Sequence, residues 1–121
     1  MRKQIAAAVM LTTSGLAAPA LADAPRVISA EATRQGEAWR FDVTVAHSDE
    51  GWDHYADAWE VRTPEGDVLA TRELLHPHVT EQPFTRSLSG VAIPEGLARV
   101  HLVARDSVHG WGEPYALDIP R

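Results

Sequence analysis

The sequence predicts an all-β fold, a seven-stranded antiparallel sandwich of the immunoglobulin or fibronectin-III type. Three observations support this expectation. Apolar and polar residues alternate along most of the chain, turn residues interrupt the alternation roughly every 8 to 12 positions, and no window of useful length has a helical period. Seven short strands in about 100 residues are typical of two packed antiparallel sheets.

The first strand is expected at residues 27–33, before a turn at Gln35 and Gly36. The second, residues 38–46, has the clearest pattern, because Trp, Phe and two Val residues alternate with polar ones. In the third, Trp59 and Val61 alternate with charged residues until the turn signal Pro-Glu-Gly at residues 64–66. Four further strands are expected at residues 67–75, 84–93, 100–105 and 115–119.

The residue types that the chain lacks exclude several kinds of chemistry. There is no cysteine, and after residue 22 there is no methionine or lysine. Disulfides, thiol chemistry and the thioether or thiolate sites that Cu(I) prefers are therefore excluded, as is a lysine Schiff base. The missing disulfide favours the fibronectin-III end of the fold class, since antibody domains carry one.

Residues 1–22 have the features of a secretory signal peptide. Arg2 and Lys3 precede an apolar run, and Ala20-Leu21-Ala22 forms a small-x-small cleavage site. The run is too short and too weakly apolar for a membrane span. We therefore expect one exported domain, residues 23–121, that is periplasmic or secreted and does not insert into a membrane.

The charge of the expected mature domain disfavours two classes of partner. Loss of Arg2 and Lys3 would change the net charge from −6 to −8. A surface of this charge repels nucleic acids and anionic lipid headgroups, so we expect neither as a partner.

Histidines gather where the predicted topology brings loops together. In a Greek-key sandwich the connections after the second, fourth and sixth strands share one end, and five of the six histidines lie in or beside them. His76 and His78 flank a proline, and in an extended segment their rings would point the same way. With two more loop histidines they predict a Cu(II) or Zn(II) site made of His54, His76, His78 and His109. Further candidate ligands, or partners of ligands, are His47, Asp53 and Asp106.

Two other interpretations of these loops stay open. The histidines can order the loops through hydrogen bonds, and His47 continues the core-facing parity of residues 38–46. Alternatively, Trp52, Tyr55 and Trp111 can bind a sugar, a peptide or a cationic ligand. No catalytic residues are predicted, because adjacent Ser, His and Asp residues in an extended chain point apart and form no triad.

Three segments, WDHYADAWEV, LLHPHVTEQPFTRSL and DSVHGWGE, resemble small, uncharacterised exported bacterial proteins of the β-sandwich type. The resemblance covers nearly the whole chain after residue 22. It implies an exported single domain and brings no activity or ligand with it. The sequence thus favours a non-enzymatic metal carrier or delivery protein, whose partners are the ion and another exported protein. The alternative is a non-catalytic interaction module that uses the loop aromatics.

Overall fold

The computed structural model describes residues 24–121, so the expected signal peptide of residues 1–22 lies outside the described residues. From residue 24 onward the chain forms strands and turns without a helix. No helix in this part of the chain is therefore long and apolar enough to cross a membrane. The strands are β1 (Arg26–Gln35), β2 (Ala38–Ala46), β3 (Ala56–Arg62), β4 (Val68–Glu73), β5 (Phe84–Val91), β6 (Arg99–Asp106), β7 (Gly110–Trp111) and β8 (Tyr115–Asp118).

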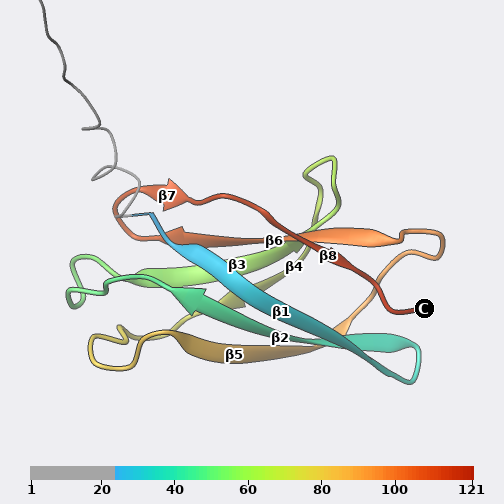
Figure 1. The fold of residues 1–121 in the computed structure, drawn as a ribbon, viewed down its shortest axis with the longest axis horizontal. Coiled ribbons are helices and arrows are strands. Elements are labelled where there is room, and N and C mark those ends of the chain that lie inside the picture. Colours follow the sequence, from blue (N-terminus) through green and yellow to red (C-terminus); the bar gives the residue numbers. More distant parts are fainter. Residues whose placement is uncertain (1–23) are drawn as a thin grey trace, which may run out of the picture.

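The strands form two antiparallel sheets that face each other (Figure 1). One sheet has the order β1-β2-β5, and the other has the order β4-β3-β6-β7, with β8 also paired to β6. The predicted all-β architecture of two antiparallel sheets is confirmed. Its assignment to the immunoglobulin or fibronectin-III type stays a prediction.

The predicted number of seven strands is wrong, because the described residues contain eight. The additional strand is β7, which has only two residues and pairs Trp111 with Arg105 and Gly110 with Asp106 of β6. Two residues are too few to show an alternating pattern, so the sequence alone predicts a loop for this segment.

The core lies between the sheets and follows the alternation predicted for β2. Trp39, Phe41, Val43 and Val45 are buried on one face of that strand. They belong to one apolar cluster with Trp59 and Val61 of β3 and with residues of β6. The large side chains on the inner faces of both sheets interlock, and this packing fixes the position of one sheet relative to the other.

Three connections meet at one end of the sandwich, on the left in Figure 1. They are residues 47–55 after β2, residues 74–83 after β4 and residues 107–109 after β6, and we call this region the loop end. Pairing of Ala56 with Asp106 and of Val45 with Phe84 brings these connections into register. The loop end is where the sequence predicts that the histidines gather.

Candidate metal centre

Asp106, the last residue of β6, is the centre of the candidate site. Its side chain is fully buried, and its Oδ1 atom accepts hydrogen bonds from the backbone N–H groups of Val108 (2.9 Å) and His109. This turn fixes the carboxylate and leaves Oδ2 facing the neighbouring loops. Burial alone would raise the pKa of Asp106, but the hydrogen bonds from His109, Val108 and His54 together hold it well below its usual range.

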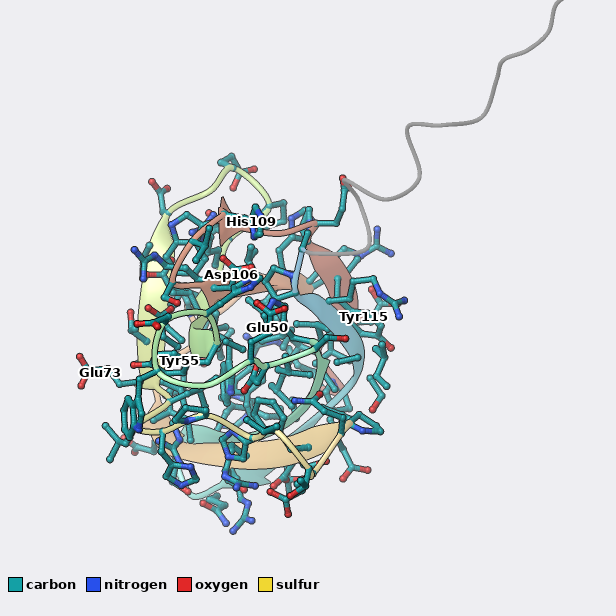
Figure 2. All side chains as sticks on the ribbon, turned by 90° about the vertical axis from the view of Figure 1, so that its left-hand side faces the viewer. Glu50, Tyr55, Glu73, Asp106, His109 and Tyr115 are labelled. Atoms are coloured by element: carbon teal, nitrogen blue, oxygen red, sulfur yellow. The ribbon has the colours of Figure 1, made fainter. Side chains whose placement is uncertain are left out.

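Three imidazole nitrogens surround Asp106 Oδ2. His47 Nε2 lies at 3.0 Å, His54 Nε2 at 3.2 Å and His109 Nδ1 at 3.0 Å from this oxygen. The rings are close neighbours, since the centroids of His47 and His54 and those of His54 and His109 are each 4.9 Å apart. Figure 2 looks onto this end of the molecule, with His109 and Asp106 above the loop that carries Glu50. Residues from the loop after β2, from the end of β6 and from the turn after β6 thus converge.

The outer nitrogens of two of these rings also face carboxylates. His47 Nδ1 is 2.6 Å from Asp49 Oδ1, and both side chains are fully buried. His54 Nδ1 is 2.9 Å from Glu50 Oε1, and the hydrogen bond to Glu50 is the main reason that the pKa of His54 is raised. Carboxylates in this outer position orient imidazole ligands and keep the proton on the nitrogen that faces away from a metal ion.

The inner atoms form a group that could hold a metal ion. His47, His54 and Asp106 each offer one ligand atom, and these atoms lie within 4.8 Å of one another. Imidazole nitrogen and carboxylate oxygen are donors for both Zn(II) and Cu(II), and zinc lies about 2.0 to 2.2 Å from such atoms. His109 is not part of this group, but its Nδ1 atom lies 3.0 Å from Asp106 Oδ2, and its side chain is the most accessible of the four at 39% exposed. The site is therefore buried on one side and open to solvent at His109.

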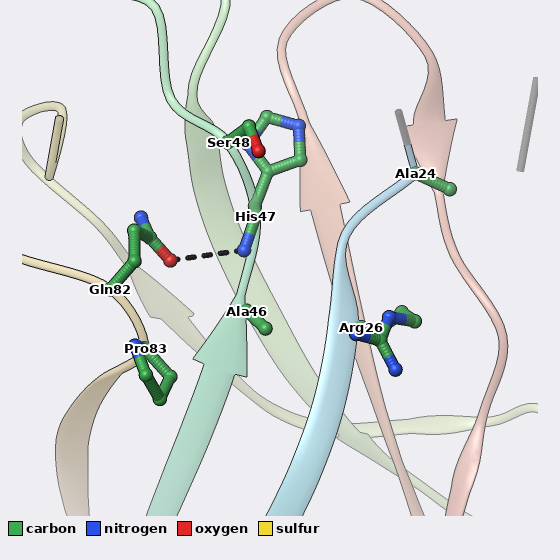
Figure 3. Close-up of a pocket in the computed structure, with 7 residues that line it drawn as sticks. All are labelled: Ala24, Arg26, Ala46, His47, Ser48, Gln82 and Pro83. Atoms are coloured by element: carbon green, nitrogen blue, oxygen red, sulfur yellow. Dashed lines mark hydrogen bonds between the residues drawn. The ribbon is translucent and has the colours of Figure 1, made fainter. Parts of the chain in front are cut away.

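The connection of residues 74–83 is hydrogen-bonded to the segment that carries His47. Gln82 Oε1 accepts the backbone N–H of His47 at 3.0 Å (Figure 3), and Gln82 Nε2 donates to the carbonyl of His78. A pocket of about 250 Å³ lies beside this bond and is lined in part by Arg26 and Ser48. Asp49 ties the same elements together, because its carboxylate also accepts the N–H groups of Ala56 (3.0 Å) and His78 (2.7 Å). Loss of either side chain would free the segment that carries His47.

The structure brings together only part of the predicted ligand set. His54 and His109 lie together with His47 and Asp106, which were the further candidates. Asp53 is exposed at the tip of its loop.

His76 and His78 form a separate pair with ring centroids 4.6 Å apart. His78 stacks on Phe84 (3.9 Å between centroids) and accepts a hydrogen bond at Nε2 from Arg86 (2.8 Å). A guanidinium group only donates, so this nitrogen has no lone pair left for a metal ion. Burial, followed by the positive charge of Arg86, lowers the pKa of His78. The pair lies outside the group around Asp106, and the hydrogen bond from Arg86 occupies His78 Nε2, so a metal clamp at His76 and His78 stays a prediction.

The predicted aromatic cluster is also divided. The rings of Trp52 and Tyr55 make an edge contact with centroids 5.6 Å apart. Trp111 contacts the guanidinium group of Arg62 (4.5 Å), the last residue of β3, whereas Tyr55 immediately precedes that strand.

The sequence alone assigns no role to Asp49, Glu50 or Gln82. A signal for Asp49 is present, since it follows His47 by two residues and an extended segment directs both to the same side. Glu50 and Gln82 carry no comparable signal. Their contacts depend on a turn at residues 51–54 and on packing between two loops.

Comparison with known proteins brings no activity. No protein-family model matches the chain. Over 77 residues, 64% of this chain, the sequence is 49% identical to a protein of Halomicrobium mukohataei named "Putative lipoprotein". The chain spans 37% of the length of that relative. The fold is similar to that of hypothetical protein PH1083 from Pyrococcus horikoshii OT3, with a TM-score of 0.52, 12% identity and coverage of 79% of this chain and 87% of that one. At this identity the likeness shows the fold alone, and neither name carries a ligand.

Proposed function

We propose that this protein binds a divalent transition-metal ion, Zn(II) or Cu(II), at the loop end through His47, His54, His109 and Asp106. One observation carries the proposal: both ring nitrogens of His47 and both of His54 face carboxylate oxygens. A neutral imidazole has one N–H group and one lone pair, so it can donate to only one of its two carboxylates.

A bound cation satisfies all of these contacts. Asp49 and Glu50 receive the Nδ1–H groups of His47 and His54, which leaves both Nε2 lone pairs directed toward Asp106 Oδ2. In a neutral ring without a cation, the nitrogen that lacks the proton directs its lone pair at a carboxylate oxygen, which is repulsive. A divalent ion bound to the two Nε2 atoms and Asp106 Oδ2 would remove this repulsion, and any proton held at those atoms would be released on binding.

The donor set and the accessibility of the site favour a carrier or delivery role. Three imidazoles and one carboxylate suit Zn(II), and they bind Cu(II) more tightly according to the usual order of divalent-metal affinity. Exposure of His109 gives an acceptor access to the ion. Periplasmic or secreted localisation is supported by the signal-peptide features of residues 1–22 and by the name of the Halomicrobium mukohataei relative. The partner that we propose is another exported protein.

Thermal unfolding after chelation, followed by separate addition of Zn(II), Cu(II) and Ni(II), tests this function. An ion at a hundredfold excess over its Kd stabilises the fold by about 2.7 kcal/mol, which raises Tm by several degrees. The variant His54→Gln with His109→Gln should lose most of this shift. The control His76→Gln should keep it, because His76 lies outside the group. No shift with any ion, or an equal shift in both variants, would refute the proposal and leave the histidines as hydrogen-bonding residues that order the loops.

A further inference from the structure

The loop end exposes an unusual share of the large apolar side chains in residues 24–121. Trp52, Leu75, Val79 and Val108 are between 55% and 71% exposed, and all four lie in the three connections around the candidate metal centre. Exposed apolar side chains that gather on one face of a small domain mark an interaction site. Elsewhere on the described chain, the exposed large apolar residues are Ile28, Val68 and Trp111.

The turns that position the metal-centre side chains also hold two of these apolar residues outward. In the loop after β2, Gly51 accepts the N–H of His54 at 3.1 Å and His54 accepts the N–H of Glu50 at 2.8 Å, so Trp52 occupies the tip. The edge contact with Tyr55 steadies the Trp52 ring. Val108 lies between Asp106 and His109, in the turn closed by the Asp106 carboxylate. A molecule that covers these two side chains therefore also meets His109, the most accessible candidate ligand.

The charge of the loop end is of one sign. Its three connections contain no lysine or arginine, and Glu50, Asp53 and Glu81 are exposed there. Of the arginines on the flanking strands, Arg86 pairs with Glu81 (3.3 Å) and Arg105 with Asp57 (2.6 Å), whereas Arg26 is exposed beside the pocket next to His47. The surface is thus apolar side chains among carboxylates.

We propose that the loop end is the docking surface for a protein whose contact face has apolar residues surrounded by lysine and arginine, and that this partner exchanges the metal ion with the site. The inference rests on the proposed metal-binding function. Complementary charge steers such a partner to the site, and a tryptophan that becomes buried on binding, as Trp52 would, is a common anchor of protein interfaces. Anionic lipid would meet repulsion from the carboxylates, and a second copy of this chain would oppose the same charges.

Carbodiimide crosslinking tests the docking surface directly. The only lysine of the chain is Lys3, so the protein has few amines with which its own carboxylates can react. Crosslinks from the carboxylates of the protein to a lysine-bearing probe can therefore be detected with little interference from self-crosslinking. The probe is a synthetic peptide of alternating lysine and leucine with two histidines. We expect crosslinks at Asp53 and Glu81 and few at Glu65 and Glu95, which are exposed acids at the opposite end. An even distribution over all four acids would overturn the proposal.

The rate of zinc transfer tests whether docking serves the metal site. Zinc-loaded protein is mixed with the same peptide, with a matched peptide that has glutamate in place of lysine, or with EDTA. We expect the basic peptide to remove zinc at least about tenfold faster than the acidic one. Trp52→Ser with Val108→Ser should abolish this advantage, whereas Ile28→Ser with Val68→Ser should retain it. Equal rates with both peptides, or an unchanged advantage in the first variant, would overturn the docking surface.

Three further measurements distinguish a basic protein partner from a lipid surface, from a second copy of this chain and from a change in zinc affinity. Zinc affinity, measured by titration before transfer, should be equal in wild type and in both double variants. Failure of the wild type to bind either Zn(II) or Cu(II) would refute the proposed function, whereas the crosslinking result would still stand alone. Binding of the loaded protein to phosphatidylglycerol vesicles through Trp52, or dimerisation that is lost in the Trp52→Ser variant, would overturn the basic protein partner.

Discussion

The Nε2 atom of His47 lies 3.0 Å from Oδ2 of Asp106, and neither side chain has any exposure to solvent. His47 follows β2 of one sheet and Asp106 ends β6 of the other, so this contact joins the two sheets at the loop end. A buried charged group is stable only when it is paired and hydrogen-bonded. The pair therefore serves the fold and, in the function that we propose, supplies two ligands.

Replacement of Asp106 tests the centre of the site. Asp106→Asn keeps the size of the side chain and an oxygen for the backbone N–H groups of Val108 and His109 but removes the negative charge. We expect the affinity for Zn(II) to fall by more than about 100-fold, because the change removes a ligand rather than an outer partner. Competition with a chelator of known affinity measures this loss. Asp118→Asn, at an exposed pair with Arg99, is the control, and an affinity that matches in the two variants would contradict the assignment.

Asp49 is expected to act on the metal through His47. Asp49→Asn weakens the contact to His47 Nδ1 and should lower Zn(II) affinity about 10- to 100-fold. The same change should lower the free energy of unfolding in the presence of chelator by about 1 to 3 kcal/mol, because a buried hydrogen-bonding group loses a partner. Calorimetric titration and urea unfolding measure the two effects. A loss of stability with unchanged affinity would assign Asp49 to the fold alone.

His78 and His109 should behave in opposite ways. His78→Gln removes a stacked, buried ring and should destabilise the fold by about 1 to 3 kcal/mol while Zn(II) affinity changes little. His109→Gln removes a partly exposed ring and should lower affinity with a small effect on stability. Unfolding and metal titration of both variants test this, and the reverse pattern would favour the His76-His78 pair as the metal clamp.

The dependence of stability on pH should include a contribution from Asp42, far from the loop end. The hydrogen bond from Arg40, aided by that from Ser87, lowers the pKa of Asp42 below its usual value of about 3.9. A carboxyl group with a lowered pKa in the folded state stabilises the fold above its unfolded pKa, and this stabilisation is lost as the pH falls through the folded pKa. Asp42→Asn should therefore be less stable than wild type near pH 7, and the difference should shrink as the pH falls below about 3.9 and through the folded pKa. Urea unfolding over a series of pH values provides the comparison. A gap that persists at acid pH would show that Asp42 acts through packing.

The sequence by itself determined where most strands lie and which faces they bury. Along residues 38–46 the polarity of each side chain predicts whether it is buried, because a strand places alternate residues on opposite faces. The same alternation and the turn signals predicted the meeting of three histidine-bearing loops at one end. The burial of a strand residue and the formation of a turn depend mainly on nearby residues, so the local sequence pattern predicts both.

Only the tertiary structure decided which side chains meet in the candidate metal centre. His47 and Asp106 are 59 residues apart in the chain, and their contact depends on the pairing of Ala56 with Asp106 and on the packing of the two sheets. His76 and His78 have the better spacing for a clamp, but Phe84 and Arg86 hold His78 elsewhere. Strand register and loop geometry decide which distant side chains meet, and a local pattern of residues predicts neither of them.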